Sequence, residues 1–237
     1  MSHAQLLTDA QALWAEVAAA PVAFPEQGIS VVASPASRLC PPGWVGLVLL
    51  ADSGIGTTPD QEAADTVREL LADYPPKGLY DRPEAAKALP ATAMLGPTTL
   101  AYLAPERFHP AAGPAVEQLP VEHPDLRALE NLCSPEERDE ASIDELTSPV
   151  FAIGEGGEVV AAAGYVAWPR NTAHMAILTA PSARGRGLAK VAASSAVAHA
   201  LAAHMLPQWR ARVPASQRVA RALGFTDLGV QISLKLA

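Results

Sequence analysis

The sequence is poor in cysteine and in positive charge. Its only two cysteines, Cys40 and Cys133, lie far apart, and this spacing matches neither a disulfide framework nor a metal site. Lysine and arginine total 17 against 25 aspartate and glutamate residues, for a formal net charge of −8. Nucleic acid and anionic membranes attract basic surfaces, so we expect neither as a partner. We also expect no bound metal.

Long apolar runs are lacking as well. The longest stretch without a charged residue, Val191 to Trp209, contains two serines, two histidines, a proline and a glutamine. These polar groups would destabilise a helix in a bilayer, so we predict no transmembrane segment. The first residues, MSHAQLLTDAQALWAEV, include acidic residues where a secretory signal is basic and then apolar. We therefore expect a protein of the cytoplasm.

What the sequence does contain is an alternation of helical and extended patterns, with 49% apolar residues to form a core. In the first half the expected elements are a helix over 4–19, strands over 28–34 and 44–51, a helix within 58–74 and an apolar run over 99–104. Either Thr58 or Asp60 is expected to cap the second helix. This order predicts an α/β arrangement.

A proline-rich segment then separates two parts of the chain. Residues 104–118 contain three prolines and a glycine between patterned segments, which favours a domain boundary. We predict an N-terminal α/β domain over residues 1–112 and a second domain over 113–237.

The second domain has a distinct order of elements. They are a strand over 115–119, helices over 124–133 and 134–146, a two-stranded hairpin over 149–168, a strand over 173–178, a helix over 188–205, a strand over 208–213, a helix over 216–223 and a strand over 230–236. Ser134 is expected to cap the second helix, and Gly154 to Gly157 to form the hairpin turn. One face of the long helix is expected to carry Leu188, Val191, Ala198, Leu201 and Met205.

Two glycines surround an arginine just before that long helix. The start of a helix exposes unpaired N–H groups and a partial positive charge, which together attract phosphate. Gly185 and Gly187 would let a pyrophosphate approach the backbone, while Arg184 and Arg186 would add cationic donors. The stretch therefore predicts a pyrophosphate site.

Two common phosphate-binding motifs do not fit this stretch. The P-loop pattern G-x-x-x-x-G-K-[ST] does not occur in the sequence. The dinucleotide fingerprint G-x-G-x-x-G/A fails because Lys190 stands where the third small residue belongs. A third design remains.

Arg184 to Ala189 matches the pattern Arg/Gln-x-x-Gly-x-Gly/Ala, the acyl-coenzyme A loop of the GCN5-related N-acetyltransferase (GNAT) superfamily. The downstream segment over 206–225 also resembles this superfamily, with Ser216 in a helix and Leu223-Gly224-Phe225 after it. The order of elements is similar too. The resemblance covers roughly residues 113 to 237.

This resemblance implies a mixed-sheet α/β fold that binds acetyl-CoA and transfers its acetyl group to an amine of a small molecule. The strand before the loop would splay away from the strand over 208–213, with the pantetheine arm in the gap. Main-chain groups of Leu178 and Ala180 would bond the pantetheine amides, and the loop N–H groups the pyrophosphate. The coenzyme contacts implied in this way are Leu178, Thr179, Ala180, Arg184, Gly185, Arg186, Gly187, Leu188 and Ala189.

The catalytic groups are less clearly marked. Many relatives carry a tyrosine acid at the position of Ala220 and an asparagine at that of Val213. Any acid would then lie elsewhere or be water, and a non-catalytic acyl-CoA-binding regulatory module is the alternative function. A structural protein with no coenzyme affinity is a third reading.

His174, on the strand before the loop, is the candidate general base, because an imidazole titrates near neutral pH. The other reading of His174 is an ordinary strand residue. Ser216 would either bond the pantetheine or thiolate, or cap its helix. Further candidates are Tyr165, Glu155 and Glu158, more simply explained by ring packing and turn charges.

Other features leave alternatives open. Arg210, Arg212, Arg218 and Arg221 are expected on a solvated face, with a contact to the nucleotide as the alternative. The first half is either a degenerate copy of the same fold or a separate substrate-selecting domain. A homodimer is also left open.

Overall fold

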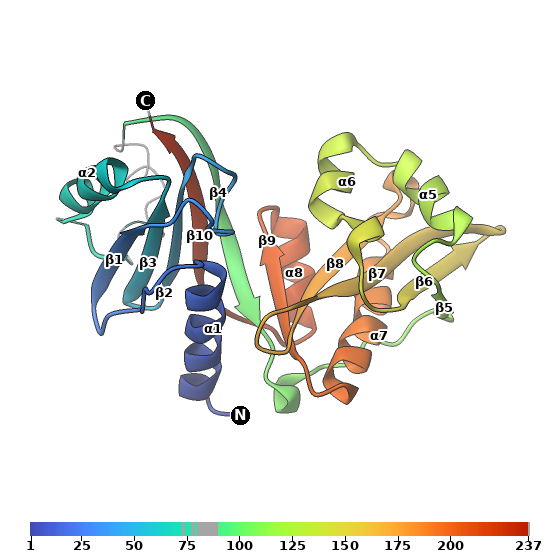
Figure 1. Cartoon of the computed structure of the whole chain (residues 1–237). Coiled ribbons are helices and arrows are strands. Elements are labelled where there is room, and N and C mark those ends of the chain that lie inside the picture. Colours follow the sequence, from blue (N-terminus) through green and yellow to red (C-terminus); the bar gives the residue numbers. More distant parts are fainter. Residues whose placement is uncertain (73, 77–78, 80–89, 237) are drawn as a thin grey trace. The chain divides into compact units, whose positions relative to one another are not determined.

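The computed structural model describes residues 1–72, 74–76, 79 and 90–236 (Figure 1). The chain forms two compact units, one made of Met1–Ala101 with Asp227–Ala237 and the other of Tyr102–Thr226. The boundary expected at residue 112 falls inside the second unit, and the last strand belongs to the first.

The first unit is a sheet with helices. Its elements are α1 (His3–Val17), β1 (Gly28–Ala33), β2 (Val45–Leu50), β3 (Ser53–Thr58), α2 (Gln61–Leu71), β4 (Ala91–Tyr102) and β10 (Thr226–Leu236). The strand order is β1-β3-β2-β10-β4, with β1 parallel to β3 and β2 antiparallel to both of its neighbours. Asp60 is the cap of α2, since its carboxylate accepts the N–H of Ala63 at 2.8 Å. The predicted helices and strands of this half are confirmed.

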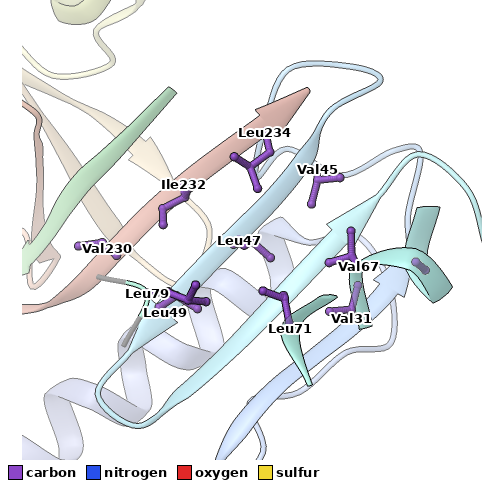
Figure 2. Packing of buried hydrophobic residues seen from close by; sticks show 11 residues of the cluster. Val31, Val45, Leu47, Leu49, Val67, Leu71, Leu79, Val230, Ile232 and Leu234 are labelled. Atoms are coloured by element: carbon purple, nitrogen blue, oxygen red, sulfur yellow. The ribbon is translucent and has the colours of Figure 1, made fainter. Parts of the chain in front are cut away.

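The core of this unit joins segments from both ends of the sequence (Figure 2). Its buried members are Val31, Val45, Leu47, Leu49, Ala64, Val67, Leu71, Leu79, Val230, Ile232 and Leu234. Strand β10 contributes the last three while it pairs with β2 from Gly229 opposite Leu50 to Leu234 opposite Val45. The C-terminal strand therefore completes the apolar face of the first unit.

Strand β3 is an element that the sequence patterns do not predict. Its sequence, SGIGTT, contains two glycines, which usually indicate a turn. A Cβ added at Gly54 would lie 2.7 Å from Leu49 Cδ2, and one at Gly56 would lie 2.9 Å from Leu47 Cδ2. Glycine is needed there because large leucines of the neighbouring strand occupy the space.

The second unit also combines strands with helices. Its elements are η1 (Pro105–Arg107), β5 (Glu117–Leu119), α5 (Pro124–Asn131), α6 (Pro135–Ala141), η2 (Ile143–Glu145), β6 (Val150–Glu155), β7 (Glu158–Trp168), β8 (Thr172–Thr179), η3 (Pro181–Ala183), α7 (Leu188–Ala202), β9 (Leu206–Ala211) and α8 (Pro214–Ala222). The strand order is β9-β8-β7-β6-β5, and only the β8–β9 pair is parallel. The expected α/β class and the expected order of elements are confirmed.

Three local predictions need correction, and they concern α6, the β6–β7 turn and α7. The helix expected over 134–146 has its predicted cap at Ser134 but ends at Ala141, because Ser142 takes a left-handed conformation with φ of 41°. The hairpin turn is shorter than predicted: Gly156 and Gly157, with φ of 61° and 88°, form the two-residue loop.

The long helix α7 also differs from its predicted pattern. Ala198 is exposed, Leu201 is only partly buried and Met205 lies beyond the helix. The buried residues form a broader set, namely Leu188, Val191, Ala192, Ala193, Ser194, Ala196, Val197 and Ala200. Buried positions lie around most of the circumference of this helix, so a single apolar stripe does not describe it. None of the described helices is both long and apolar enough to cross a membrane.

Ile232→Ala tests the role of β10 in the first unit. Ile232 is fully buried in the cluster of Figure 2, so the truncation is expected to lower the free energy of unfolding by about 2–5 kcal/mol. Hydrogen exchange should become faster in β2 and β3, and the exposed position Lys235→Ala provides the control. Unchanged stability of Ile232→Ala would contradict the assignment of β10 to this core.

Candidate functional site

The site begins where two parallel strands separate. Strands β8 and β9 pair only at Thr172–Leu206, Ala173–Pro207 and His174–Gln208. Beyond this point β8 continues to Thr179 and β9 to Ala211. The two strands therefore leave a gap that widens toward their carboxyl ends.

A cavity of about 650 Å³ occupies this gap. Its walls come from β8, the glycine loop, the start of α7, β9, α8 and two glutamates of α6. Its lining residues include Met175, Ile177, Leu178, Thr179, Arg184, Gly185, Gly187, Leu188, Ala189, Lys190, Trp209, Arg210, Ser216, Arg218, Glu137 and Glu140.

The glycine loop forms one rim of the cavity. Gly185 and Gly187 have φ of +75° and +81°, and a Cβ added at either would meet no atom within 4 Å. Gly187 is the N-cap of α7 and offers no side-chain acceptor to the first turn. In the described part of the chain, the backbone N–H groups from Gly185 to Ala189 donate to no backbone carbonyl. These N–H groups are therefore free to bind an anion.

The arginines of the loop are held by glutamates. Arg184 forms a 2.8 Å ion pair with Glu137 of α6 and donates from Nε to the carbonyl of Thr179. Arg186 makes a two-pronged pair with Glu155 at the end of β6. Hydrogen bonds from Arg186 lower the pKa of Glu155, and the Ser134 backbone N–H and Arg184 lower that of Glu137. The loop is thus positioned by charge pairs on both sides.

The helix α8 provides a hydroxyl. Ser216 lines the cavity, and its oxygen accepts the indole N–H of Trp209 at 2.9 Å. The N-cap of α8 is Val213, so Ser216 does not cap the helix. Because the Ser216 oxygen is the acceptor in that bond, its own hydrogen can be donated to another group.

Comparison with known families adds to this geometry. A family model described as GNAT acetyltransferase matches residues 150–229. That range contains the β6–β7 hairpin, β8, the glycine loop, α7, β9 and α8. Residues 150–229 thus form a domain that matches the GNAT acetyltransferase family. The resemblance stated from the sequence is confirmed.

Solved structures of GNAT proteins are also similar to the chain. Proteins of this family from Novosphingobium aromaticivorans and Kribbella flavida are 19% and 17% identical, each with a TM-score of 0.49. The first match covers 61% of this chain and 65% of that one, and the second covers 62% and 61%. This chain thus spans less than two thirds of either protein.

A further similar structure matches a larger share of the chain. A GCN5-related N-acetyltransferase-like protein from Streptococcus suis is 18% identical, with a TM-score of 0.45, and the match covers 81% of this chain and 84% of that one. No curated protein matches the sequence.

The structure brings most of the predicted coenzyme residues of the GNAT domain together. Leu178, Thr179, Arg184, Gly185, Gly187, Leu188 and Ala189 all line the cavity. Two do not. Arg186 turns its guanidinium to Glu155, and the N–H of Ala180 is already donated to the carbonyl of Val160 at 2.9 Å.

His174 is not among the lining residues. Its imidazole stacks on Trp168 with ring centroids 4.2 Å apart, and its Nδ1 lies 2.5 Å from Oε1 of Gln208. Burial, with a smaller effect of nearby Arg210, lowers the pKa of His174 to about 3. The imidazole is therefore neutral at physiological pH but weakly basic. A role as general base stays a prediction.

The other polar candidates have structural partners. The hydroxyl of Tyr165 lies 3.0 Å from Nδ1 of His199, and burial raises the pKa of Tyr165. Glu158 is exposed at the start of β7. The described residues contain no group of three or more metal-ligating side chains.

The four arginines expected on a solvated face, Arg210, Arg212, Arg218 and Arg221, do not share one face. Arg218 and Arg221 are exposed, and Arg212 pairs with Glu140 at 2.8 Å. Arg210 instead lines the cavity, where its Nε is buried. The sequence signal for this was the period-2 spacing of Gln208 and Arg210, which places both polar side chains on one face of β9. The glutamates of α6 were missed because the helix pattern says nothing about which strand it covers.

The low pKa of His174 predicts a pH effect on stability. An imidazole in the unfolded chain titrates near about 6.5, so the unfolded state takes up this proton first as the pH falls. Stability is therefore lost between about pH 6.5 and 3, by up to about 1.4 kcal/mol per pH unit from this group.

Denaturant titrations of the wild type and His174→Gln at several pH values measure this effect. The variant is expected to lose less stability between pH 7 and 5 than the wild type. His3→Gln, at an exposed position, provides the control. Equal pH dependence in wild type and His174→Gln would contradict the prediction.

Proposed function

We propose that the GNAT domain binds acetyl-CoA in the cavity between β8 and β9 and transfers the acetyl group directly to an amine of a small molecule. The observation that carries the proposal is the glycine loop at the rim of this cavity, with its free N–H groups at the start of a 15-residue helix. The pyrophosphate would accept hydrogen bonds from Gly185 to Ala189. Lys190 and Arg218 supply further positive charge at the cavity.

The cavity has the size of a small-molecule site and contains an unsatisfied polar group. Its volume of about 650 Å³ lies within the range of roughly 300–1,000 Å³ that is common for small-molecule sites. The hydroxyl oxygen of Thr179 is buried without a hydrogen-bond partner among the described residues. Such orphaned polar atoms are costly unless a ligand satisfies them.

Acyl transfer has simple chemical requirements. The amine nitrogen bonds to the acyl carbon as the carbon–sulfur bond breaks, the nitrogen loses a proton and the departing sulfur gains one. Ser216 would donate its hydroxyl hydrogen to the sulfur, since its oxygen already accepts the indole N–H of Trp209. Water would take the proton from the amine, and His174, which lies outside the cavity lining, would act as the base only through such water. Holding both reactants together would supply much of the acceleration.

Gly187→Asp tests the loop. The new carboxylate would point into the space expected for the pyrophosphate, so the affinity for acetyl-CoA should fall at least about 100-fold through lost charge-assisted bonds and repulsion. Calorimetric titration with acetyl-CoA and with free CoA measures this directly.

Gly43→Asp is the matched control. Gly43 has φ of +78° and open space around an added Cβ, as Gly187 does, but it lies in the first unit. It carries the same backbone strain and charge, and its coenzyme affinity should equal that of the wild type. Unchanged affinity of Gly187→Asp would overturn the assignment of the loop.

Ser216→Ala tests the hydroxyl. Loss of one hydrogen bond to a charged sulfur should lower kcat about 10-fold or more, while the Kd for acetyl-CoA stays near that of the wild type. Release of free thiol with a panel of amines gives kcat, and Ser216→Thr, which keeps a hydroxyl, should recover part of it. A kcat equal to that of the wild type would exclude this role.

The same measurements separate the alternative function. Ala220 is buried and Val213 is half exposed at the positions where many relatives carry polar catalytic groups. Tight coenzyme binding without turnover of any amine would favour a regulatory acyl-CoA-binding module, whereas turnover of any amine would exclude it.

A further inference from the structure

Arg210 is a cation in the cavity that acetyl transfer as described does not use. It extends from β9, and its guanidinium carbon lies 5.9 Å from the ring centroid of Trp168. Its Nε is buried without a hydrogen-bond partner. It forms neither a hydrogen bond nor an ion pair with any residue that the structure describes.

Its place along the strand separates Arg210 from the glycine loop. The β8–β9 ladder ends at the His174–Gln208 pair, and Arg210 is two residues further along β9. At about 3.3 Å per residue, this is roughly 7 Å past the end of the ladder. Thr179, after which the loop begins, is about 17 Å past the same point on β8. Arg210 therefore lies at the inner end of the cavity, away from the N–H groups expected to bind pyrophosphate.

The carboxylates nearest to Arg210 already have partners. Arg210 lies on β9, and Arg212 follows directly after the strand ends at Ala211. Arg212 pairs with Glu140 of α6 at 2.8 Å, and Arg184 pairs with Glu137 of the same helix at 2.8 Å. Both carboxylates that α6 contributes to the cavity are therefore already paired. Glu140 and Tyr102 still act on Arg210 electrostatically, but Arg210 forms no ion pair of its own among the described residues.

Burying an unpaired charge is costly, and the charge becomes favourable once an anion pairs with it. A guanidinium held against an aromatic ring presents its flat fork of N–H donors, which matches a carboxylate. We propose that Arg210 binds a carboxylate of a substrate at the inner end of the cavity, next to the reacting atoms. This inference rests on the proposed acyl transfer, and the carboxylate belongs either to the acceptor amine, as in an amino acid, or to a dicarboxylic acyl group on the donor.

Paired substrates identify the source of the carboxylate. The acceptor arm compares amino acids with the amines left by their decarboxylation, for example phenylalanine with phenylethylamine and lysine with 1,5-diaminopentane. The donor arm compares succinyl-CoA with acetyl-CoA. In either the acceptor arm or the donor arm, the kcat/KM of the wild type is expected to be at least 10-fold higher for the substrate with the carboxylate than for its partner without it.

Arg210→Gln should abolish that preference. The expected loss in kcat/KM is roughly 10- to 100-fold for the carboxylate-bearing substrate, as for one charge-assisted hydrogen bond, with little change for its partner. Arg210→Lys should keep part of the preference, and Arg221→Gln, which removes a charge from α8 outside the cavity, should keep all of it. An equal loss for both members of each pair, or turnover by the wild type without preference in either arm, would overturn the proposal.

A binding measurement tests Arg210 independently of turnover. Succinate alone should raise the thermal unfolding midpoint of the wild type and not that of Arg210→Met. Without ligand, Arg210→Met should unfold at a higher temperature than the wild type, because it removes an unpaired buried charge and keeps an apolar stem. A lower midpoint together with an unchanged succinate effect would assign Arg210 a structural role and overturn the proposal. Failure of the wild type to bind acetyl-CoA would instead refute the proposed function, and the succinate result would still decide the role of Arg210.

Discussion

The β8–β9 ladder stops after three residue pairs, and the whole candidate site depends on that stop. Parallel strands in the middle of a sheet normally leave no space between them. Here the strands separate beyond His174 and Gln208, so their carboxyl ends can border a cavity of about 650 Å³. The same separation leaves main-chain and side-chain groups of both strands available to a ligand. Nearly every residue discussed as functional lies on this gap or at its rim.

Charge pairing distinguishes two regions of this cavity. At the rim, the loop arginines are neutralised by Glu137 and Glu155, so the backbone N–H groups of the helix start remain as the main anion binders. At the inner end, Arg210 has an aromatic ring beside it and forms no ion pair among the described residues, because Glu140, which acts on it electrostatically, is paired with Arg212. A coenzyme with its phosphates at the rim would satisfy the first region. A carboxylate on the acceptor or on the acyl group would satisfy the second.

The first unit shows why a boundary drawn from sequence differs from the one in the structure. Residues 104–118 contain three prolines, yet the C-terminal strand crosses back to pair with β2 and bury Val230, Ile232 and Leu234. Local composition carries no information on such a return, because strand pairing depends on residues far apart in the chain. Strand β3 was not predicted for a related reason. Its glycines make room for leucine side chains of β2, whereas the sequence pattern suggested a turn.

From the sequence alone, most helices and strands, the α/β class, the GNAT resemblance and the glycine loop could be predicted. These features are local: hydrophobic periodicity, a helix start and a short motif are all contained within a few consecutive residues. The partners of the loop arginines, the hidden position of His174 and the unpaired state of Arg210 could not be predicted. They depend on which helix covers which strand and on where a ladder ends, and only the tertiary packing of segments distant in sequence decides that.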